Sequence, residues 1–174
     1  MKFNVFNAQI GIKLDGLESR NTSLLAHGVG AHLDKEPLMS FISAGPADRL
    51  ENLKPILDND IGTIFGLEVA LYSDHLGVAG RCDCIAQYNG VPSIIDFKTS
   101  RYIKKKEKIS NYFAQGAAYA IMWEERTGMV IPNVVVIMDV DHEKPLVFVE
   151  HRDNYTKLLK ETIDEYRTRK MFGH

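Results

Sequence analysis

The sequence contains only two cysteines, Cys82 and Cys84, among 174 residues. A four-cysteine iron–sulfur cluster is therefore excluded. Two thiolates without further cysteines or a matched histidine pair also make a poor zinc site. Residues two apart on one strand share a face, and such neighbours rarely form a disulfide. We therefore expect both cysteines to be small buried apolar residues in a reducing compartment.

The chain also lacks a strong net charge and any long apolar segment. It carries 21 basic and 23 acidic residues, so binding to a polyanion would need a local basic patch. No apolar stretch approaches transmembrane length, and the first residues lack the apolar core of a signal peptide. With the short chain, these absences favour a cytoplasmic protein of a bacterial or phage-infected cell, with no membrane partner.

Hydrophobic residues make up 45% of the chain and charged residues 25%, which suits one globular domain with a sizeable core. The patterns predict a helical N-terminal part followed by a strand-rich core. The predicted helices are 17–34, 35–44, 46–58, Tyr102–Arg126 and 153–170, and the predicted strands are about 62–72, 78–88, 91–98, Val134–Val140 and Leu146–Val149. This order predicts an α/β (α+β) domain with a central mixed β-sheet flanked by helices. The long helix lies between strands 91–98 and 134–140, as expected for a crossover between parallel strands.

The most informative feature is a hairpin that carries two aspartates. Asn89-Gly90 favours a two-residue type I′ turn. With these residues as the loop, Asp83 falls directly opposite Asp96, and Lys98 points to the same side as Asp96. Pro92 agrees with this register, because it falls at a position that does not form hydrogen bonds to the neighbouring strand.

The preceding strand supplies a third carboxylate if residues 74–77 form a four-residue loop. Glu68 then lies opposite Asp83, whereas a loop of three or five residues would turn Glu68 to the other face.

Like charges directly opposite each other destabilise a sheet, so we expect a compensating cation. Magnesium takes one or two carboxylates together with waters and substrate phosphate, and it suits phosphodiester hydrolysis. Lys98 would then place its ammonium near the attacked phosphate. The alternative is a surface hairpin with an ordinary Asp96–Lys98 ion pair. The apolar neighbours Ile94, Ile95 and Phe97 favour a buried strand, where unpaired charges are costly.

Three motifs in order resemble the PD-(D/E)XK nuclease superfamily in its RecB-like branch. They are Gly80-Arg81-Cys82-Asp83, Asp96-Phe97-Lys98-Thr99 and Gln115-Gly116-Ala117-Ala118-Tyr119. The likeness covers roughly residues 62–125 and is strongest to the mitochondrial genome maintenance exonuclease and its phage and bacterial relatives. It implies a restriction-endonuclease-like core spanning about 62–170 within a single domain of 1–174.

The resemblance implies a role for each matched residue. Asp83 and Asp96 correspond to the metal-binding acids, Lys98 to the catalytic lysine, and Glu68 to a further metal-binding glutamate. Gln115 and Tyr119 match the motif on the following helix, although Tyr119 alone is also compatible with a core aromatic.

An earlier match is weaker. Gly28-Val29-Gly30-Ala31-His32 fits a G-x-x-x-H pattern of these nucleases and makes His32 a metal-ligand candidate. His27 is a competitor, and a lone helix histidine is more often structural.

A dense basic run follows the second motif and adjoins the predicted site. Its members, together with a tyrosine further on, are expected to bind phosphates or stack on bases of a single strand: Ser100, Arg101, Tyr102, Lys104, Lys105 and Tyr112. The alternative is a solvated helix face.

These features predict a Mg²⁺- or Mn²⁺-dependent deoxyribonuclease that uses one or two ions and no iron–sulfur cluster. The family implies an exonuclease acting on single-stranded DNA ends, in repair or recombination and with replication or recombination proteins as possible partners. The alternatives are a structure-specific endonuclease or junction resolvase on the same fold, or a non-catalytic nucleic-acid-binding module. A small-molecule α/β enzyme is a distant alternative, because no phosphate-binding glycine loop supports it.

Overall fold

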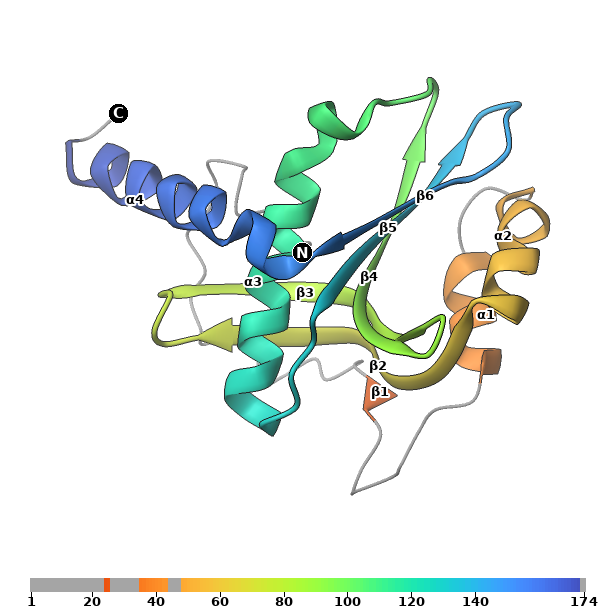
Figure 1. The fold of residues 1–174 in the computed structure, drawn as a ribbon, viewed down its shortest axis with the longest axis horizontal. Coiled ribbons are helices and arrows are strands. Elements are labelled where there is room, and N and C mark those ends of the chain that lie inside the picture. Colours follow the sequence, from red (N-terminus) through yellow and green to blue (C-terminus); the bar gives the residue numbers. More distant parts are fainter. Residues whose placement is uncertain (1–23, 26–34, 44–47, 173–174) are drawn as a thin grey trace.

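The structure is a computed structural model, and it describes residues 24–25, 35–43 and 48–172. A six-stranded sheet has the order β1-β2-β3-β4-β5-β6, and Figure 1 shows how strongly it curves. The strands are β1 (Leu24–Leu25), β2 (Ile61–Ser73), β3 (Val78–Tyr88), β4 (Val91–Ser100), β5 (Asn133–Val140) and β6 (Leu146–His151). β4 and β5 are parallel and the other neighbours are antiparallel. The sheet is therefore mixed, and the predicted α+β fold class is confirmed.

Helices lie on both sides of this sheet (Figure 1). They are α1 (Lys35–Ser43), α2 (Arg49–Asn59), α3 (Ser110–Thr127) and α4 (Thr156–Phe172), with short 3-10 helices η2 (Lys106–Ile109) and η3 (Arg152–Tyr155) before α3 and α4. α3 connects the parallel strands β4 and β5, as the sequence predicted. It ends at Gly128, whose φ of 72° gives the left-handed C-cap that glycine adopts without strain.

The predicted start of the long helix is wrong. The long helix does not start at Tyr102, because residues 101–105 lie outside helices and Tyr102 and Ile103 are exposed. The two apolar side chains of this segment are exposed, so none of them packs on the sheet to hold a helical turn in place.

The helix predicted over 17–34 is wrong at Leu24–Leu25, which pair with Leu67 and Gly66 of β2 instead. The edge of β2 offers unpaired backbone groups, and a short strand satisfies them. The rest of 17–34 lies outside the described residues.

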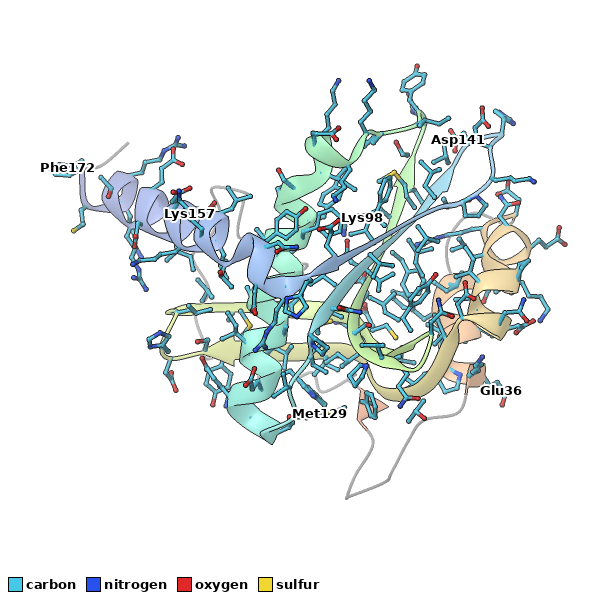
Figure 2. All side chains as sticks on the ribbon, in the orientation of Figure 1. Glu36, Lys98, Met129, Asp141, Lys157 and Phe172 are labelled. Atoms are coloured by element: carbon cyan, nitrogen blue, oxygen red, sulfur yellow. The ribbon has the colours of Figure 1, made fainter. Side chains whose placement is uncertain are left out.

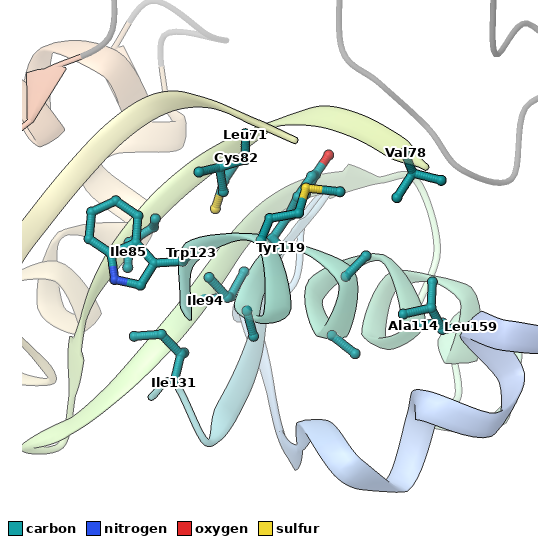
Figure 3. Packing of buried hydrophobic residues seen from close by; sticks show 14 of the residues in the cluster. Leu71, Val78, Cys82, Ile85, Ile94, Ala114, Tyr119, Trp123, Ile131 and Leu159 are labelled. Atoms are coloured by element: carbon teal, nitrogen blue, oxygen red, sulfur yellow. The ribbon is translucent and has the colours of Figure 1, made fainter. Parts of the chain in front are cut away.

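The core has a separate apolar cluster on each face of the sheet. On β4, Ile94 packs with α3 and α4, while the adjacent Ile95 packs with α1 and α2. Adjacent strand residues point to opposite faces, so both faces of the central strands are buried. Figure 3 shows Ile85 and Ile94 of the sheet against α3, with Leu159 of α4 beyond it. Among the described residues, no helix is long and apolar enough to cross a membrane.

Candidate active site

The hairpin between β3 and β4 has the predicted turn and register. Asn89 and Gly90 have φ values of 48° and 81°, and positive values at both central positions are what a type I′ turn requires. The paired residues run from Tyr88↔Val91 through Gln87↔Pro92 to Cys84↔Ile95. The next residues along this register are Asp83 and Asp96.

The regular pairing of β3 with β4 stops just before these two aspartates. The carboxylate of Asp83 instead accepts a hydrogen bond from the backbone N–H of Phe97, at 3.1 Å. The side chain of Asp83 thus takes the donor that a continuing ladder would have paired with a backbone carbonyl. The two strands begin to separate where the two carboxylates lie.

Both aspartates are buried, with Asp83 3% and Asp96 7% exposed. Burying a carboxylate is costly unless it is paired or hydrogen-bonded. Lys98 Nζ lies 2.6 Å from Asp96 Oδ1. Lys98 therefore points to the same side as Asp96, as strand alternation predicted. Two buried acids and one ammonium are therefore concentrated at one point of the sheet, near the N-terminal half of α3, where Figure 2 labels Lys98.

Glu68 lies opposite Asp83 as predicted, because its neighbours Leu67 and Val69 pair with Cys84 and Cys82. The four-residue loop 74–77 is confirmed, because Ser73 pairs with Val78. Glu68, however, has a left-handed backbone with φ of 52°, and its carboxylate lies 2.7 Å from Arg81 Nη2. Arg81 Nε also donates to the Glu68 carbonyl at 3.2 Å. A guanidinium, which sequence reasoning did not include, therefore holds Glu68.

The left-handed residue also changes which side chains share a face. Leu67 packs with α1 and α2, whereas Val69, two residues further, packs with α3 and α4. On β3, Cys84 pairs with Leu67 and packs with α1 and α2, whereas Cys82 pairs with Val69 and packs with α3 and α4. The expectation that the two cysteines share a face is therefore wrong, because the alternation of both strands resets at this point. Both thiols are free and buried, as predicted.

Gln115 and Tyr119 of α3 lie on the side of the sheet that carries the aspartates. Both are buried, and Gln115 Nε2 donates to Tyr119 Oη at 3.2 Å. Burial raises the pKa of Tyr119 well above its usual value, and negative charge on Cys82, Asp96 and Asp83 adds to the effect. Figure 3 shows Tyr119 beside Cys82, the residue that precedes Asp83. Tyr119 is thus both a core aromatic and a neighbour of the site.

The basic segment after β4 is an exposed loop next to the site. Ser100 Oγ donates to the Tyr102 carbonyl at 2.7 Å and so shapes the loop, while Arg101, Tyr102 and Lys105 are exposed. Tyr102 is 78% exposed and so remains accessible for stacking on a base. Tyr112 is instead half-buried, with Lys98 Nζ and Lys104 Nζ 5.2 and 5.7 Å from its ring centroid.

The side chains of the site meet part of what a divalent metal requires. Asp83 and Asp96 provide two adjacent carboxylates, which fits Mg²⁺ because that ion usually binds one or two carboxylates with waters and phosphate oxygens. Within the described residues no group of three or more histidine, cysteine, aspartate or glutamate side chains is placed to hold a metal. The ion pair of Glu68 with Arg81 accounts for the missing third carboxylate. His32 and its competitor His27 lie outside the described residues.

Sequence reasoning missed two contacts of this site. Arg81 lies within the first motif, but the alternation of β3 resets between Cys82 and Cys84, so no local signal showed its contact with Glu68. Tyr112 comes three residues before Gln115, close to one helical turn, and that spacing was the signal for its place near the site.

No family model matches the chain, and a search of curated proteins found no match. Seventeen solved chains are similar to this protein, and two of them illustrate the match. The first, named "Putative exonuclease" from Eubacterium rectale, has 15% sequence identity and a TM-score of 0.42, over 77% of this chain and 50% of that one. The second, a protein named SSO0001, has 16% identity and a TM-score of 0.37, over 74% of this chain and 67% of that one. The present chain thus matches half the length of the Eubacterium rectale protein.

Proposed function

We propose that this protein is a metal-dependent deoxyribonuclease of the RecB-like branch of the PD-(D/E)XK superfamily, with one nuclease domain in residues 1–174. The observation that carries the proposal is the buried pair Asp83 and Asp96 beside Lys98, at the point where β3 and β4 separate. The Phe97 N–H and the Lys98 ammonium offset part of the cost of burying these neighbouring carboxylates, and a bound divalent cation would offset it further.

Asp83 and Asp96 would hold Mg²⁺ or Mn²⁺, as one ion or two. When bound, such an ion polarises a phosphoryl oxygen and lowers the pKa of a coordinated water. Lys98 keeps an ammonium within the same site, since its Nζ lies 2.6 Å from Asp96. That ammonium would stabilise negative charge that develops on the attacked phosphate.

Gln115 and Tyr119 would position the acids from the α3 side. Their mutual hydrogen bond and their burial fix the phenol in one place. Because the phenol pKa is raised, Tyr119 stays neutral and keeps its hydroxyl proton at physiological pH. Glu68 would join the metal ligands only if its ion pair with Arg81 opened on substrate binding.

The substrate would be DNA, which the enzyme would degrade from a single-stranded end. Arg101, Lys104 and Lys105 provide cations next to the site, and phosphate neutralisation by such side chains supplies most of the non-specific affinity for nucleic acids. Tyr102 offers an exposed ring for stacking on a base. The preference for ends and single strands follows the family resemblance, as do a cytoplasmic setting and partners in replication or recombination.

The test uses end-labelled linear and covalently closed circular single-stranded DNA, each with Mg²⁺, Mn²⁺ or EDTA. We expect the wild type to degrade the linear form with either metal and to leave circles intact. The variant Lys98→Ala should lose the activity. A matched control is Lys54→Ala, because Lys54 also pairs with an aspartate, at 2.7 Å, but lies on the exposed surface of α2.

Each alternative function predicts a different result. Cutting of circles would identify an endonuclease instead. Binding of DNA without cutting under any metal condition would identify a binding module. Unchanged activity in Lys98→Ala would remove the role assigned to that lysine.

A further inference from the structure

Lys98 needs a second fixed contact if the proposed function holds. Lys98 Nζ pairs with Asp96, and that carboxylate is also the group assigned to the metal. A lysine has four rotatable bonds and holds its place poorly without a further partner. The structure contains such a partner in the ring of Tyr112.

Tyr112 lies at the start of α3 and is fixed by packing. Its side chain is half-buried against an apolar cluster of α3 and β5 that includes Phe113 and Met138. Met138 is the register partner of Lys98 across the parallel pair β4 and β5. The same packing that joins α3 to the sheet therefore sets the ring next to Lys98.

Two ammonium groups share this ring. Lys98 Nζ lies 5.2 Å and Lys104 Nζ 5.7 Å from its centroid, both inside the range of about 6 Å in which a cation is attracted to an aromatic face. Lys104 Nζ is also 3.5 Å from Tyr112 Oη. Bringing two like charges together is unfavourable, and the negative face of the ring offsets that cost.

We propose that Tyr112 is a positioning residue that holds Lys98 for the attacked phosphate and Lys104 as a second cation for the DNA strand. This assignment rests on the proposed function and replaces the expectation that Tyr112 stacks on a base. The ring holds Lys98, whereas the hydroxyl adds a contact only to Lys104. The two roles are therefore separable by substitution.

Three variants separate the roles in cleavage of linear single-stranded DNA with Mg²⁺. Tyr112→Phe keeps the ring, so kcat should stay within about twofold of the wild type, while KM rises. Tyr112→Leu removes the ring, so kcat should fall about tenfold, which lies between the effects of an exposed and a fully desolvated cation–π contact. Lys104→Met should raise KM and flatten the salt dependence of binding, with kcat little changed.

The matched control is Tyr72→Leu. Tyr72 lies on β2 and carries its own cation–π contact, with Arg126 Cζ 3.1 Å from the ring centroid, but it takes no part in the site. This variant should leave kcat unchanged. Equal losses of kcat in Tyr112→Leu and Tyr72→Leu would overturn the positioning role, as would a Tyr112→Phe that behaves like Tyr112→Leu.

A second readout does not depend on nuclease activity. The ring current of Tyr112 should shift the ε-methylene NMR signals of Lys98 and Lys104 upfield, with the signals assigned through Lys98→Arg and Lys104→Arg. The shifts should persist in Tyr112→Phe and disappear in Tyr112→Leu. Unshifted signals in the wild type would overturn the contact itself, whereas shifted signals in a protein that cuts no DNA would refute the proposed function alone.

Discussion

The position of α3 on the sheet depends on Gly116. A β-carbon added to this residue would lie 2.2 Å from Val134 Cγ1 and 3.0 Å from Val134 Cγ2. Carbon atoms in ordinary contact are roughly 3.5 Å or more apart, so a methyl group at Gly116 cannot fit without a shift of α3 or β5. Since Gln115 and Tyr119 are on the same helix, such a shift would also displace the candidate site.

The expected cost of Gly116→Ala follows from these distances. Insertion of a methyl group into a packed core costs about 1–3 kcal/mol, and this overlap belongs at the upper end. Alanine is about 1 kcal/mol better than glycine inside a helix, which offsets part of that cost. We expect a net loss of about 2 kcal/mol in the free energy of unfolding.

Urea denaturation followed by circular dichroism measures this loss and its cause. In a Val134→Ala background both methyl groups are removed and only the β-carbon of residue 134, at 3.2 Å, stays close to the added methyl group. Gly116→Ala should there cost much less, close to neutral, because the helix preference for alanine offsets the remaining tight contact. Gly128→Ala is the control. Alanine at this position would be strained by the left-handed backbone alone, because nothing lies within 4 Å of the added β-carbon. The cost of Gly128→Ala should therefore be the same in both backgrounds. An equal cost of Gly116→Ala in both backgrounds would refute the close-approach explanation.

The remaining predictions concern charge and ionisation. Burial raises the folded-state pKa of the Cys82 and Cys84 thiols above the ordinary 9.0, so their contribution to stability is complete below pH 9 and is lost as the pH rises further. Above pH 9, each thiol should lower the free energy of unfolding by about 1.4 kcal/mol per pH unit. Urea denaturation between pH 8 and 10.5 should therefore show a shallower decline of this free energy in a Cys82→Ala/Cys84→Ala variant than in the wild type. Parallel declines in the two proteins would contradict this. For the half-buried ion pair, a double-mutant cycle of Arg81→Met with Glu68→Gln should give a coupling energy of about 1 kcal/mol or more, and a value near zero would show that Arg81 does not hold Glu68.

The hairpin was predictable from the sequence because its determinants are local. Asn89-Gly90 fixes the turn type, the turn fixes the register, and alternation then places Asp83, Asp96 and Lys98. The four-residue loop at 74–77 was predictable for the same reason. The gross order of strands and helices also followed from patterns within single segments.

The remaining features depend on contacts between segments that are distant in sequence. No local pattern shows that Glu68 takes a left-handed backbone and pairs with Arg81, or that Cys82 and Cys84 then pack on opposite sides of the sheet. The contact of Tyr112 with Lys98 arises only when α3 docks beside β4.

The most direct test of the account is cleavage of end-labelled linear single-stranded DNA with Mg²⁺ by the wild type and by Asp83→Asn/Asp96→Asn. We expect stepwise loss of the DNA with the wild type and none with the double variant, while circular dichroism shows both proteins folded. Cleavage by the double variant at the wild-type rate would contradict the assignment of the site.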